Sequence, residues 1–310
     1  MARVIFMGTP QFAVPALEAL GKNHEVVGVV TQPDRRAGRG RKMVPSPVKE
    51  AAMARGLPTF QPSDLQIPEA VNTLAGWQPE VIAVFAFGQL LPRPVLELPP
   101  YGCLNIHPSL LPRYRGAAPI TAAILAGDLI TGVTIMLMDE GLDTGPILAQ
   151  GESPIAPGDT TVSLTAKLAE EGATLLIKTL PGWLKGKIQA RPQDEALATY
   201  CDHLKKEDGL LDWSQPAEYL DRQVRAYDPW PGAHTTWLGK RLKVLRARPQ
   251  TAWRGEGSPG QVVALPGGMG VATGRGLLEL QEVQLAGKMP IAGDVFARGQ
   301  RDLIGGFLGT

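Results

Sequence analysis

The chain has 310 residues, 44% of them hydrophobic, and its 31 basic and 30 acidic side chains leave a net charge of +1. This length allows two domains of about 100 to 200 residues each, and the balanced charge excludes a uniformly basic nucleic-acid binder and an acidic tail protein. An anionic partner must therefore be bound by local patches of positive charge. The two cysteines, Cys103 and Cys201, lie far apart without a CxxC pattern, which argues against a disulfide framework or a zinc knuckle.

The N-terminus shows no targeting pattern. It begins with the strand-like sequence RVIFMG, without a charged segment and a longer apolar segment before a cleavage site. No apolar run in the chain approaches the length of about 18 residues that a membrane span requires. We therefore expect a protein that is neither exported nor membrane-spanning, with a cytoplasmic location.

Residues 1–188 alternate short apolar runs with helical patterns. The runs, in chain order, are VIFMG, EVVGVVTQ, VIAVFAFG, GCLNIH and GVTIMLMD. Apolar strands separated by helices predict βαβ units, and hence an α/β domain with a Rossmann-like, doubly wound parallel sheet. Leucines at helical spacing between residues 161 and 180 predict a long amphipathic helix that closes at Pro181 and Gly182.

The composition changes after residue 188. Residues 189–205 are polar and mixed, which is typical of a linker. Residues 206–310 contain one helical pattern, AEYLDRQVRAY, followed by many short β-like segments separated by glycine. This half of the chain is predicted to form a second, smaller domain, an antiparallel β-barrel of the OB-like kind.

A polar pair stands at the end of one predicted strand, in the sequence GCLNIHPSLLP. Asn105 and His107 are two residues apart, so both side chains should leave the same face of the strand. In open parallel sheets ligands bind beyond the carboxyl ends of the strands, and two donors there are suited to stabilise an oxyanion. A buried pair that satisfies loop backbone groups is an equally good interpretation of these two residues alone.

Acidic residues follow a second predicted strand, in MDEGLDTGPI. Of Asp139, Glu140 and Asp143, the last is the best placed to raise the pKa of a histidine or to hold a water. An aspartate that caps a glycine-rich turn is the alternative. Because no activated serine, cysteine or metal cluster accompanies these residues, the nucleophile should come from the substrate, and acyl or formyl transfer is the predicted reaction. No metal is expected.

Two basic stretches are candidates for contacts to phosphate. The sequence DRRAGRGRK carries the first set, and the second follows in the C-terminal half. A solvated loop and a protected edge strand are the respective alternatives. The cations are Arg35, Arg36, Arg39, Arg41 and Lys42 in the first stretch, and Lys240, Arg241, Lys243, Arg246, Arg248 and Arg254 in the second.

The sequence NIHPSLLPRYRGAAP resembles the signature of the folate-dependent formyltransferases. The segments VIFMGTPQFAVPALEAL, VVTQPDRRAGRGRKMVPSPVKE and GVTIMLMDEGLDTGPIL resemble the branch of this family that formylates methionyl-tRNA, and the resemblance covers nearly the whole chain. It implies that 10-formyltetrahydrofolate donates a formyl group to the α-amino group of initiator methionyl-tRNA. It also implies Asn105, His107 and Asp143 as catalytic residues.

The same resemblance implies two binding regions. Folate would lie against Ser109, Leu110, Leu111 and Pro112, and less securely against Gln89, Leu90 and Leu91. The first basic stretch would enter the acceptor end of the tRNA, where Arg39 matches a key arginine of the family and Arg36 stands where proline is frequent. The second basic stretch would contact tRNA from the C-terminal domain, residues 206–310.

Four alternatives remain at this stage. A UDP-amino-sugar formyltransferase or a formyltetrahydrofolate hydrolase would share the N-terminal half. A nucleotide-dependent oxidoreductase is poorly supported, because MGTPQF is not a GxGxxG fingerprint. A noncatalytic RNA-binding module would bind RNA without any folate site.

Overall fold

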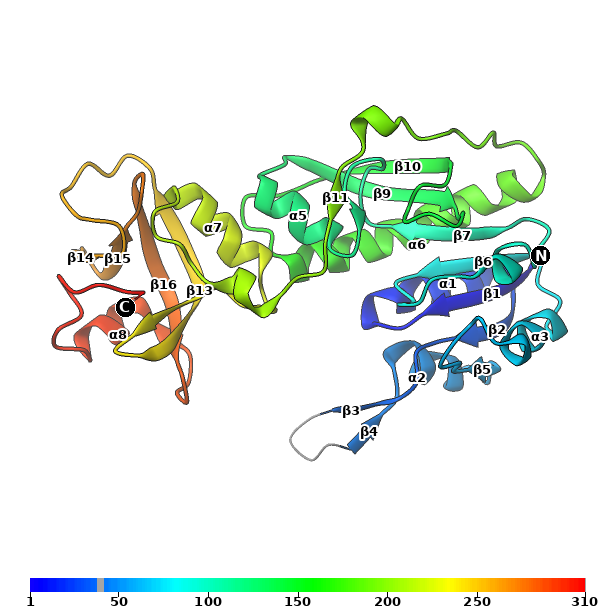
Figure 1. Ribbon diagram of the computed structural model, residues 1–310, viewed down its shortest axis with the longest axis horizontal. Coiled ribbons are helices and arrows are strands. Elements are labelled where there is room, and N and C mark those ends of the chain that lie inside the picture. The colour runs from blue at the N-terminus through cyan, green and yellow to red at the C-terminus, as the bar shows by residue number, and fades with distance from the viewer. Residues whose placement is uncertain (38–41, 310) are drawn as a thin grey trace. The chain divides into compact units, whose positions relative to one another are not determined.

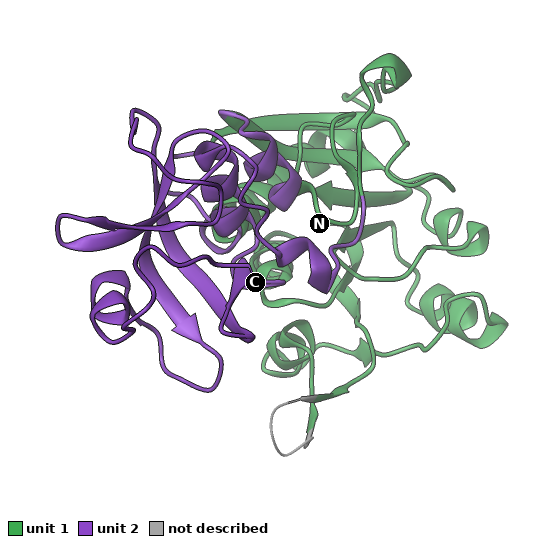
Figure 2. Cartoon of the chain, turned by 60° about the vertical axis from the view of Figure 1, so that its left-hand side comes forward, with its two compact units in different colours: residues 1–119, 130–154, 165–201 green, residues 120–129, 155–164, 202–310 purple. Residues whose placement is uncertain are grey.

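The computed structural model describes residues 1–37 and 42–309, and this part of the chain forms two compact units (Figure 2). The first unit contains Met1–Pro119, Ile130–Pro154 and Thr165–Cys201, and the second contains Ile120–Leu129, Ile155–Leu164 and Asp202–Thr310. The second unit therefore includes two short segments that precede residue 188 in the sequence. Within the described residues, no helix is long and apolar enough to cross a membrane.

A seven-stranded sheet forms the centre of the first unit, with the strand order β10-β9-β7-β6-β1-β2-β5 (Figure 1). The strands β1, β2, β5, β6 and β7 are parallel, whereas β9 is antiparallel to both β7 and β10. The predicted α/β class is confirmed, and the antiparallel edge is a feature that the apolar run of β9 did not indicate. The strands are β1 (Arg3–Gly8), β2 (Glu25–Val30), β5 (Thr59–Phe60), β6 (Val81–Phe85), β7 (Cys103–His107), β9 (Ile130–Leu137) and β10 (Ile147–Pro154).

Helices pack on both faces of this sheet. On one face, Ile5, Met7 and Ile82 pack with Leu74 of α3 and Val95 of α4. The opposite face packs against α6. This helix approaches β7 so closely that a Cβ added to Gly172 would lie 2.8 Å from the side chain of Ile106. The helices of the N-terminal half are α1 (Val14–Asn23), α2 (Pro47–Met53), α3 (Pro68–Gly76), α4 (Arg93–Leu96), α5 (Pro119–Ala126) and α6 (Thr161–Leu184), and η1 (Gln11–Ala13) is a 3₁₀ turn.

The long helix was predicted correctly except at its end. α6 continues through Pro181 to Leu184, so Pro181 lies inside the helix. Trp183 lies in this last turn, and its indole Nε1 donates a hydrogen bond of 2.8 Å to the carbonyl of Tyr101. This tertiary contact fixes a turn that the local sequence was expected to exclude.

Small elements complete the first unit. β3 (Arg35–Ala37) and β4 (Lys42–Val44) form a two-stranded ribbon, and β8 (Arg115–Gly116) pairs in parallel with β11 (Tyr200–Cys201). A 3₁₀ turn, η2 (Glu195–Leu197), precedes β11. The second of these pairs joins the segment after β7 to the last residues of the unit.

A curled antiparallel sheet with the order β12-β13-β16-β15-β14 dominates the second unit, and β17 pairs with β16. Its inner face packs with Leu220 of α7 and Phe296 of α8 into one apolar core around Leu242, Val244 and Met269. This arrangement confirms the predicted smaller β domain. Its elements are η3 (Lys206–Gly209), α7 (Ala217–Ala226), β12 (His234–Trp237), β13 (Lys240–Gln250), β14 (Val262–Leu265), β15 (Gly268–Ala272), β16 (Leu277–Leu285), β17 (Ile291–Ala292) and α8 (Gly293–Arg298).

Gly28 in β2 provides a test of this packing. A Cβ at Gly28 would lie 2.2 Å from the Trp77 ring, which itself packs edge-on against Phe60 at a centroid distance of 6.4 Å. Gly28→Ala should therefore lower the free energy of unfolding by about 1–3 kcal/mol, through overpacking. Gly21→Ala is the control, since nothing lies within 4 Å of its added Cβ and helix α1 should gain about 0.5–1 kcal/mol. Urea midpoints would measure both changes, and equal shifts of the two variants would contradict the packing argument.

Candidate active site

Asn105 and His107 point from β7 toward Asp143, which lies in the loop between β9 and β10. The Asn105 Nδ2 atom donates to Asp143 Oδ1 at 3.3 Å, and Asp143 Oδ2 lies 3.6 Å from His107 Nδ1. Because β9 is antiparallel to β7, the end of β9 lies beside Leu104, at the opposite end of β7 from His107. The loop after β9 must therefore turn back to bring Asp143 to the pair. The structure brings the three predicted residues together.

His107 is almost fully buried, with 4% of its surface exposed. Its Nε2 lies 2.9 Å from the carbonyl oxygen of Tyr114, and because a carbonyl only accepts, Nε2 carries the proton in the neutral ring. The unprotonated nitrogen is then Nδ1, on the side of Asp143. Burial lowers the pKa of His107 below its usual 6.5, and the charge of Asp143 opposes this shift only in part. Asp143 thus raises the pKa of His107, in the direction that the sequence analysis anticipated, but desolvation is the larger of the two effects.

Asp143 adopts a left-handed backbone conformation, with φ +54°, that is uncommon for a residue with a side chain. Its carboxylate accepts a hydrogen bond of 2.9 Å from the amide of Gly116, in addition to that from Asn105. The following Gly145 approaches the Leu137 carbonyl so closely that a Cβ would lie 1.9 Å from its oxygen. Two hydrogen bonds therefore hold the carboxylate, and the close approach of Gly145 to Leu137 restricts the backbone of its loop.

The other two acids of this loop have different surroundings. Asp139 Oδ1 accepts hydrogen bonds from the Gly141 amide and the Thr144 hydroxyl, so this residue caps the turn. Glu140 is exposed and lies 3.8 Å from Arg93. The turn-capping role that was an alternative for Asp143 therefore belongs to Asp139.

The residues expected to face folate divide into buried and accessible ones. The Ser109 hydroxyl donates internally to the Arg113 carbonyl at 2.6 Å, and Leu111 and Leu91 are buried in apolar clusters. The Gln89 side chain donates to the Pro62 carbonyl, while Leu90 is 79% exposed. Leu110 and Pro112, the latter after a cis peptide bond, are partly exposed at the segment after β7.

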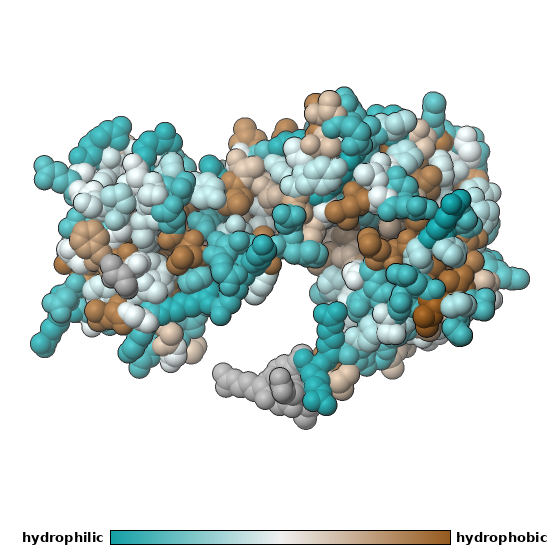
Figure 3. Space-filling model, in the orientation of Figure 1, coloured by the Kyte–Doolittle hydropathy of each residue, from teal (hydrophilic) through white to brown (hydrophobic). Residues whose placement is uncertain are grey.

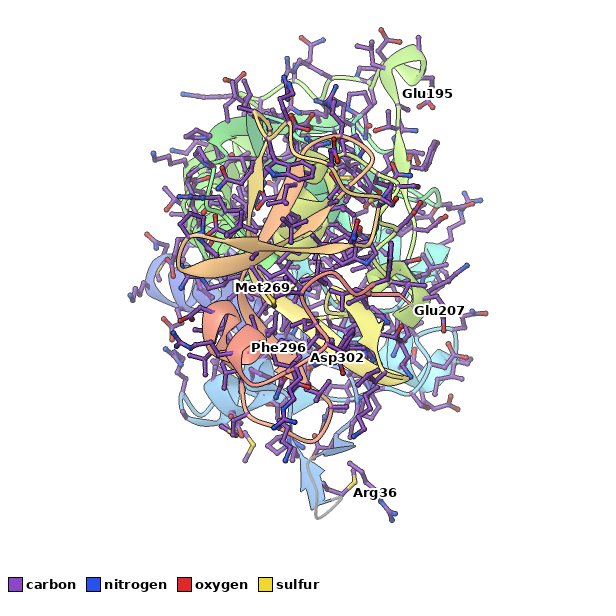
Figure 4. All side chains as sticks on the ribbon, turned by 90° about the vertical axis from the view of Figure 1, so that its left-hand side faces the viewer. Arg36, Glu195, Glu207, Met269, Phe296 and Asp302 are labelled. Carbon is purple, nitrogen blue, oxygen red and sulfur yellow. The ribbon has the colours of Figure 1, made fainter. Side chains whose placement is uncertain are left out.

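The two ends of the first basic stretch pair as the β3–β4 ribbon, and the centre of the expected loop, residues 38–41, lies outside the described residues. Arg36 pairs with Met43 across the ribbon, and Arg35 and Arg36 are exposed. Figure 4 shows Arg36 extending away from the body of the unit. Figure 3 shows hydrophilic atoms together with more hydrophobic ones at the ribbon, where Met43 and Val44 of β4 are also exposed. Arg39 and Arg41 lie outside the described residues, and for Lys42 only the backbone is described.

Asp34, the acidic residue of this basic stretch, forms its hydrogen bonds outside the ribbon. Asp34 accepts from Lys49 at 2.7 Å and from Gln61, and these hydrogen bonds hold its pKa below the usual value. Its carboxylate is thus bound on the side of α2 and β5, which leaves the ribbon strongly basic.

The cations of β13 reach one side of the sheet because of a bulge. Leu245 is skipped in the pairing of β13 with β16, and Leu242, Val244 and Ala247 face the core on either side of it. The residues that alternate with them, Lys243, Arg246 and Arg248, therefore point outward. Lys240 at the start of β13 is also exposed, whereas Arg241 is half-buried and its Nε is buried. Two of these cations have partners within the same unit. Arg248 pairs with Glu279 at 3.1 Å, and Arg241 contacts the His234 ring at 3.0 Å.

Residues missed by the sequence analysis also contact this site. Arg115, Gln193 and Glu195 form one hydrogen-bonded group beside the Asp143 loop. Arg115 follows the polar pair in the same motif, whereas nothing in the sequence connects it with residues about 80 positions later. Residues 189–201 were expected to be part of a linker, and the structure places them within the first unit.

The two cysteines lie in different surroundings. Cys201 Sγ donates to the Tyr114 carbonyl at 3.6 Å, the same oxygen that His107 Nε2 contacts, and to the Arg115 carbonyl at 3.4 Å. Cys103 is buried in the apolar core as expected, and burial raises the pKa of its thiol to about 12. Among residues 1–37 and 42–309, no group of three or more His, Cys, Asp or Glu side chains could hold a metal ion.

The comparisons with known proteins fit this arrangement. A family model described as formyl transferase matches residues 2–180, and one described as formyl transferase, C-terminal domain, matches residues 203–301. The chain is 51% identical to the methionyl-tRNA formyltransferase of Chloroflexus aurantiacus, over 96% of each chain. It is 50% identical to that of Roseiflexus castenholzii, over 98% of this chain and 97% of the relative.

Solved structures share the fold at lower sequence identity. HypX from Aquifex aeolicus in complex with tetrahydrofolic acid aligns with a TM-score of 0.64 and 21% identity, over 95% of this chain and 46% of HypX. An N-formyltransferase from Helicobacter canadensis, in complex with folinic acid and dTDP-3-aminofucose, aligns with a TM-score of 0.66 and 17% identity, over 90% and 99% of the two chains. The two family matches and the full-length relatives lead to one conclusion: the chain belongs to the formyltransferase family.

Proposed function

We propose that the chain transfers the formyl group of 10-formyltetrahydrofolate to the α-amino group of initiator methionyl-tRNA, which yields N-formylmethionyl-tRNA for translation initiation. The observation that carries this function is about 50% identity to methionyl-tRNA formyltransferases over nearly the whole chain, including the C-terminal domain. HypX and the N-formyltransferase from Helicobacter canadensis are below 25% identical to this chain, so their likeness concerns the fold alone.

The proposed function assigns different roles to the two domains. We assign catalysis to residues 1–188, with residues 189–201 packed in the same unit, and tRNA contact to residues 206–310. We assign phosphate contacts to the cations of the β3–β4 ribbon and its connection, residues 35–42, and to the outward cations of β13. Arg246 is exposed on β13, although Glu282 lies opposite it. We place folate against Leu110 and Pro112, with Gln89 and Leu90 at the neighbouring strand end and with Ser109, Leu111 and Leu91 supporting these walls from inside.

The chemistry follows from the proton positions of the site. The neutral amine attacks the formyl carbon, the N10–formyl bond then breaks, and the folate nitrogen gains a proton as the new amide loses one. His107 Nδ1 is suited to accept the proton from the attacking amine, since Nε2 is held by the Tyr114 carbonyl. The Asp143 carboxylate, 3.6 Å away, stabilises the imidazolium that results. The Asn105 amide has a second N–H to donate to the oxyanion, where the loss of one donor typically costs about 10²–10³ in turnover.

The substrate assignment can be tested by formyl transfer from 10-formyltetrahydrofolate. We expect transfer to initiator methionyl-tRNA, and much slower transfer to elongator methionyl-tRNA or to a UDP-amino sugar. Transfer to the sugar alone, or release of free formate without transfer, would assign the chain to another branch of the family.

His107→Ala tests the proposed base. Turnover should fall by about 10²–10⁴, the usual contribution of a general base, while tRNA affinity stays close to that of the unmodified chain. His203→Ala, an exposed histidine in the second unit, is the matched control and should keep full activity. Near-normal turnover of His107→Ala in a single-turnover assay would remove this residue from the chemistry.

The opposing effects on His107 predict a pH response. Burial lowers its pKa and Asp143 raises it, so the ring should be neutral at pH 7, and Asp143→Asn should lower the pKa further. Chemical-shift titration of histidine carbons by NMR would measure both values. A His107 midpoint above its usual value in the unmodified chain, or a rise in Asp143→Asn, would show that burial does not dominate.

The ribbon cations predict a salt-dependent affinity. Arg36→Ala should weaken tRNA binding and reduce the slope of log affinity against log salt by about 0.7–0.9, the value for one lost phosphate contact. Arg55→Ala removes the same charge from an arginine paired with Glu18 at 2.6 Å, and it should leave the slope unchanged. Equal slopes for the two variants would place Arg36 outside the tRNA contact.

A further inference from the structure

The segment 191–201, which we call the strap, joins two loops of the site. Its residue Arg191 exchanges two backbone hydrogen bonds with Ile147, at 2.8 and 2.9 Å, just after the Asp143 loop. At its other end, the Thr199 carbonyl accepts from the Arg115 amide at 2.8 Å, and the Cys201 carbonyl accepts from the Ala117 amide at 3.0 Å. The strap therefore connects the segment after β7 with the start of β10.

Arg115 forms the buried centre of this connection. Its side chain is 0% exposed, and its guanidinium donates to both Glu195 oxygens at 2.7 and 2.9 Å. Two further N–H groups of Arg115 donate to Gln193 Oε1, at 2.9 and 3.1 Å. Its Nη1 also donates to the Tyr200 hydroxyl at 3.1 Å. An arginine removed from water requires such a set of acceptors, and three residues of the strap supply it here.

The orientation of Gln193 follows from Arg115. Arginine has no acceptor, so the amide oxygen of Gln193 must face the guanidinium, and its nitrogen must face the opposite side. On that side Nε2 donates to the Asp143 carbonyl at 2.8 Å and to the Gly145 carbonyl at 2.7 Å. The two N–H groups of Gln193 thus hold the backbone on either side of Thr144.

We infer that Gln193, oriented by Arg115, is a positioning residue that fixes the backbone of Asp143 and thereby the place of its carboxylate beside His107. The left-handed conformation of Asp143 is a strained one for a residue with a side chain, and such conformations persist only where the surrounding contacts over-determine them. The carboxylate itself contacts the Gly116 amide, next to Arg115, so the same arginine anchors both sides of the loop. This inference rests on the proposed function, because it assigns Gln193 to the placement of that reaction's proposed residues.

Two substitutions separate the two contacts of Gln193. Gln193→Glu keeps an acceptor for Arg115 and loses both donors to the Asp143 loop, whereas Gln193→Met loses both contacts at similar volume. If the loop contact sets the site, turnover should fall in both variants on the order of 10- to 100-fold, the cost of misplacing a reacting group by about 1 Å. The KM values for 10-formyltetrahydrofolate and methionyl-tRNA should stay within about threefold, since an interaction that acts on the transition state lowers kcat.

The exchange rate of the Gly116 amide hydrogen reports whether the Asp143 carboxylate still accepts its hydrogen bond, and it does so independently of activity. The Gly116 amide donates to Asp143, and its exchange should accelerate at least about tenfold in Gln193→Glu if the carboxylate leaves. Gln189→Glu introduces the same charge at an exposed glutamine outside the strap, and it should change neither turnover nor exchange.

The outcomes distinguish this inference from the function on which it rests. Normal turnover of Gln193→Glu would overturn the inference, and so would unchanged Gly116 exchange in that variant. Failure of the unmodified chain to formylate methionyl-tRNA would instead contradict the proposed function, and the exchange comparison would still decide whether Gln193 holds the loop.

Discussion

The geometry of the candidate site depends on the interactions that the carboxylate of Asp143 makes. It meets the Asn105 amide and the Gly116 amide, and it lies 3.6 Å from the His107 ring. Each of these groups comes from the segment that includes β7 and β8, whereas Asp143 comes from the loop between β9 and β10. Without this carboxylate the buried ring would lose the charge that opposes its desolvation.

Burial and charge act in opposite directions at His107, and burial dominates. A ring that is neutral at rest can take a proton, whereas a permanent imidazolium could only donate one. The hydrogen bond to the Tyr114 carbonyl fixes which nitrogen does so, and the nearby carboxylate stabilises the charged form once it appears. In the function that we propose, His107 would therefore act first as a base and afterwards as a donor, which is the order that attack by a neutral amine requires.

The polar contacts around Arg115 show that the chain after α6 does more than connect two domains. The buried guanidinium takes its acceptors from residues 193–200, and those residues in turn hold the Asp143 loop. On the second sheet, the bulge at Leu245 has a comparable effect on a larger scale, because a shift of one residue sends Arg246 and Arg248 to the same side as Lys243. The first feature is a long-range contact and the second a local bulge, and each decides where charged groups are placed.

The sequence by itself determined the α/β class, the smaller β domain and the pairing of Asn105 with His107 on one strand face. These features follow from local periods of two and about 3.6 residues, which a single sequence displays. Only the tertiary structure decided that β9 runs antiparallel, that its loop returns Asp143 to β7, and that Asp139 caps the turn. The contacts of Arg115 with Gln193 and Glu195 join residues 78 and 80 positions apart. No local pattern encodes such contacts, because they arise when two segments are brought together by the packing of the sheet and α6 between them.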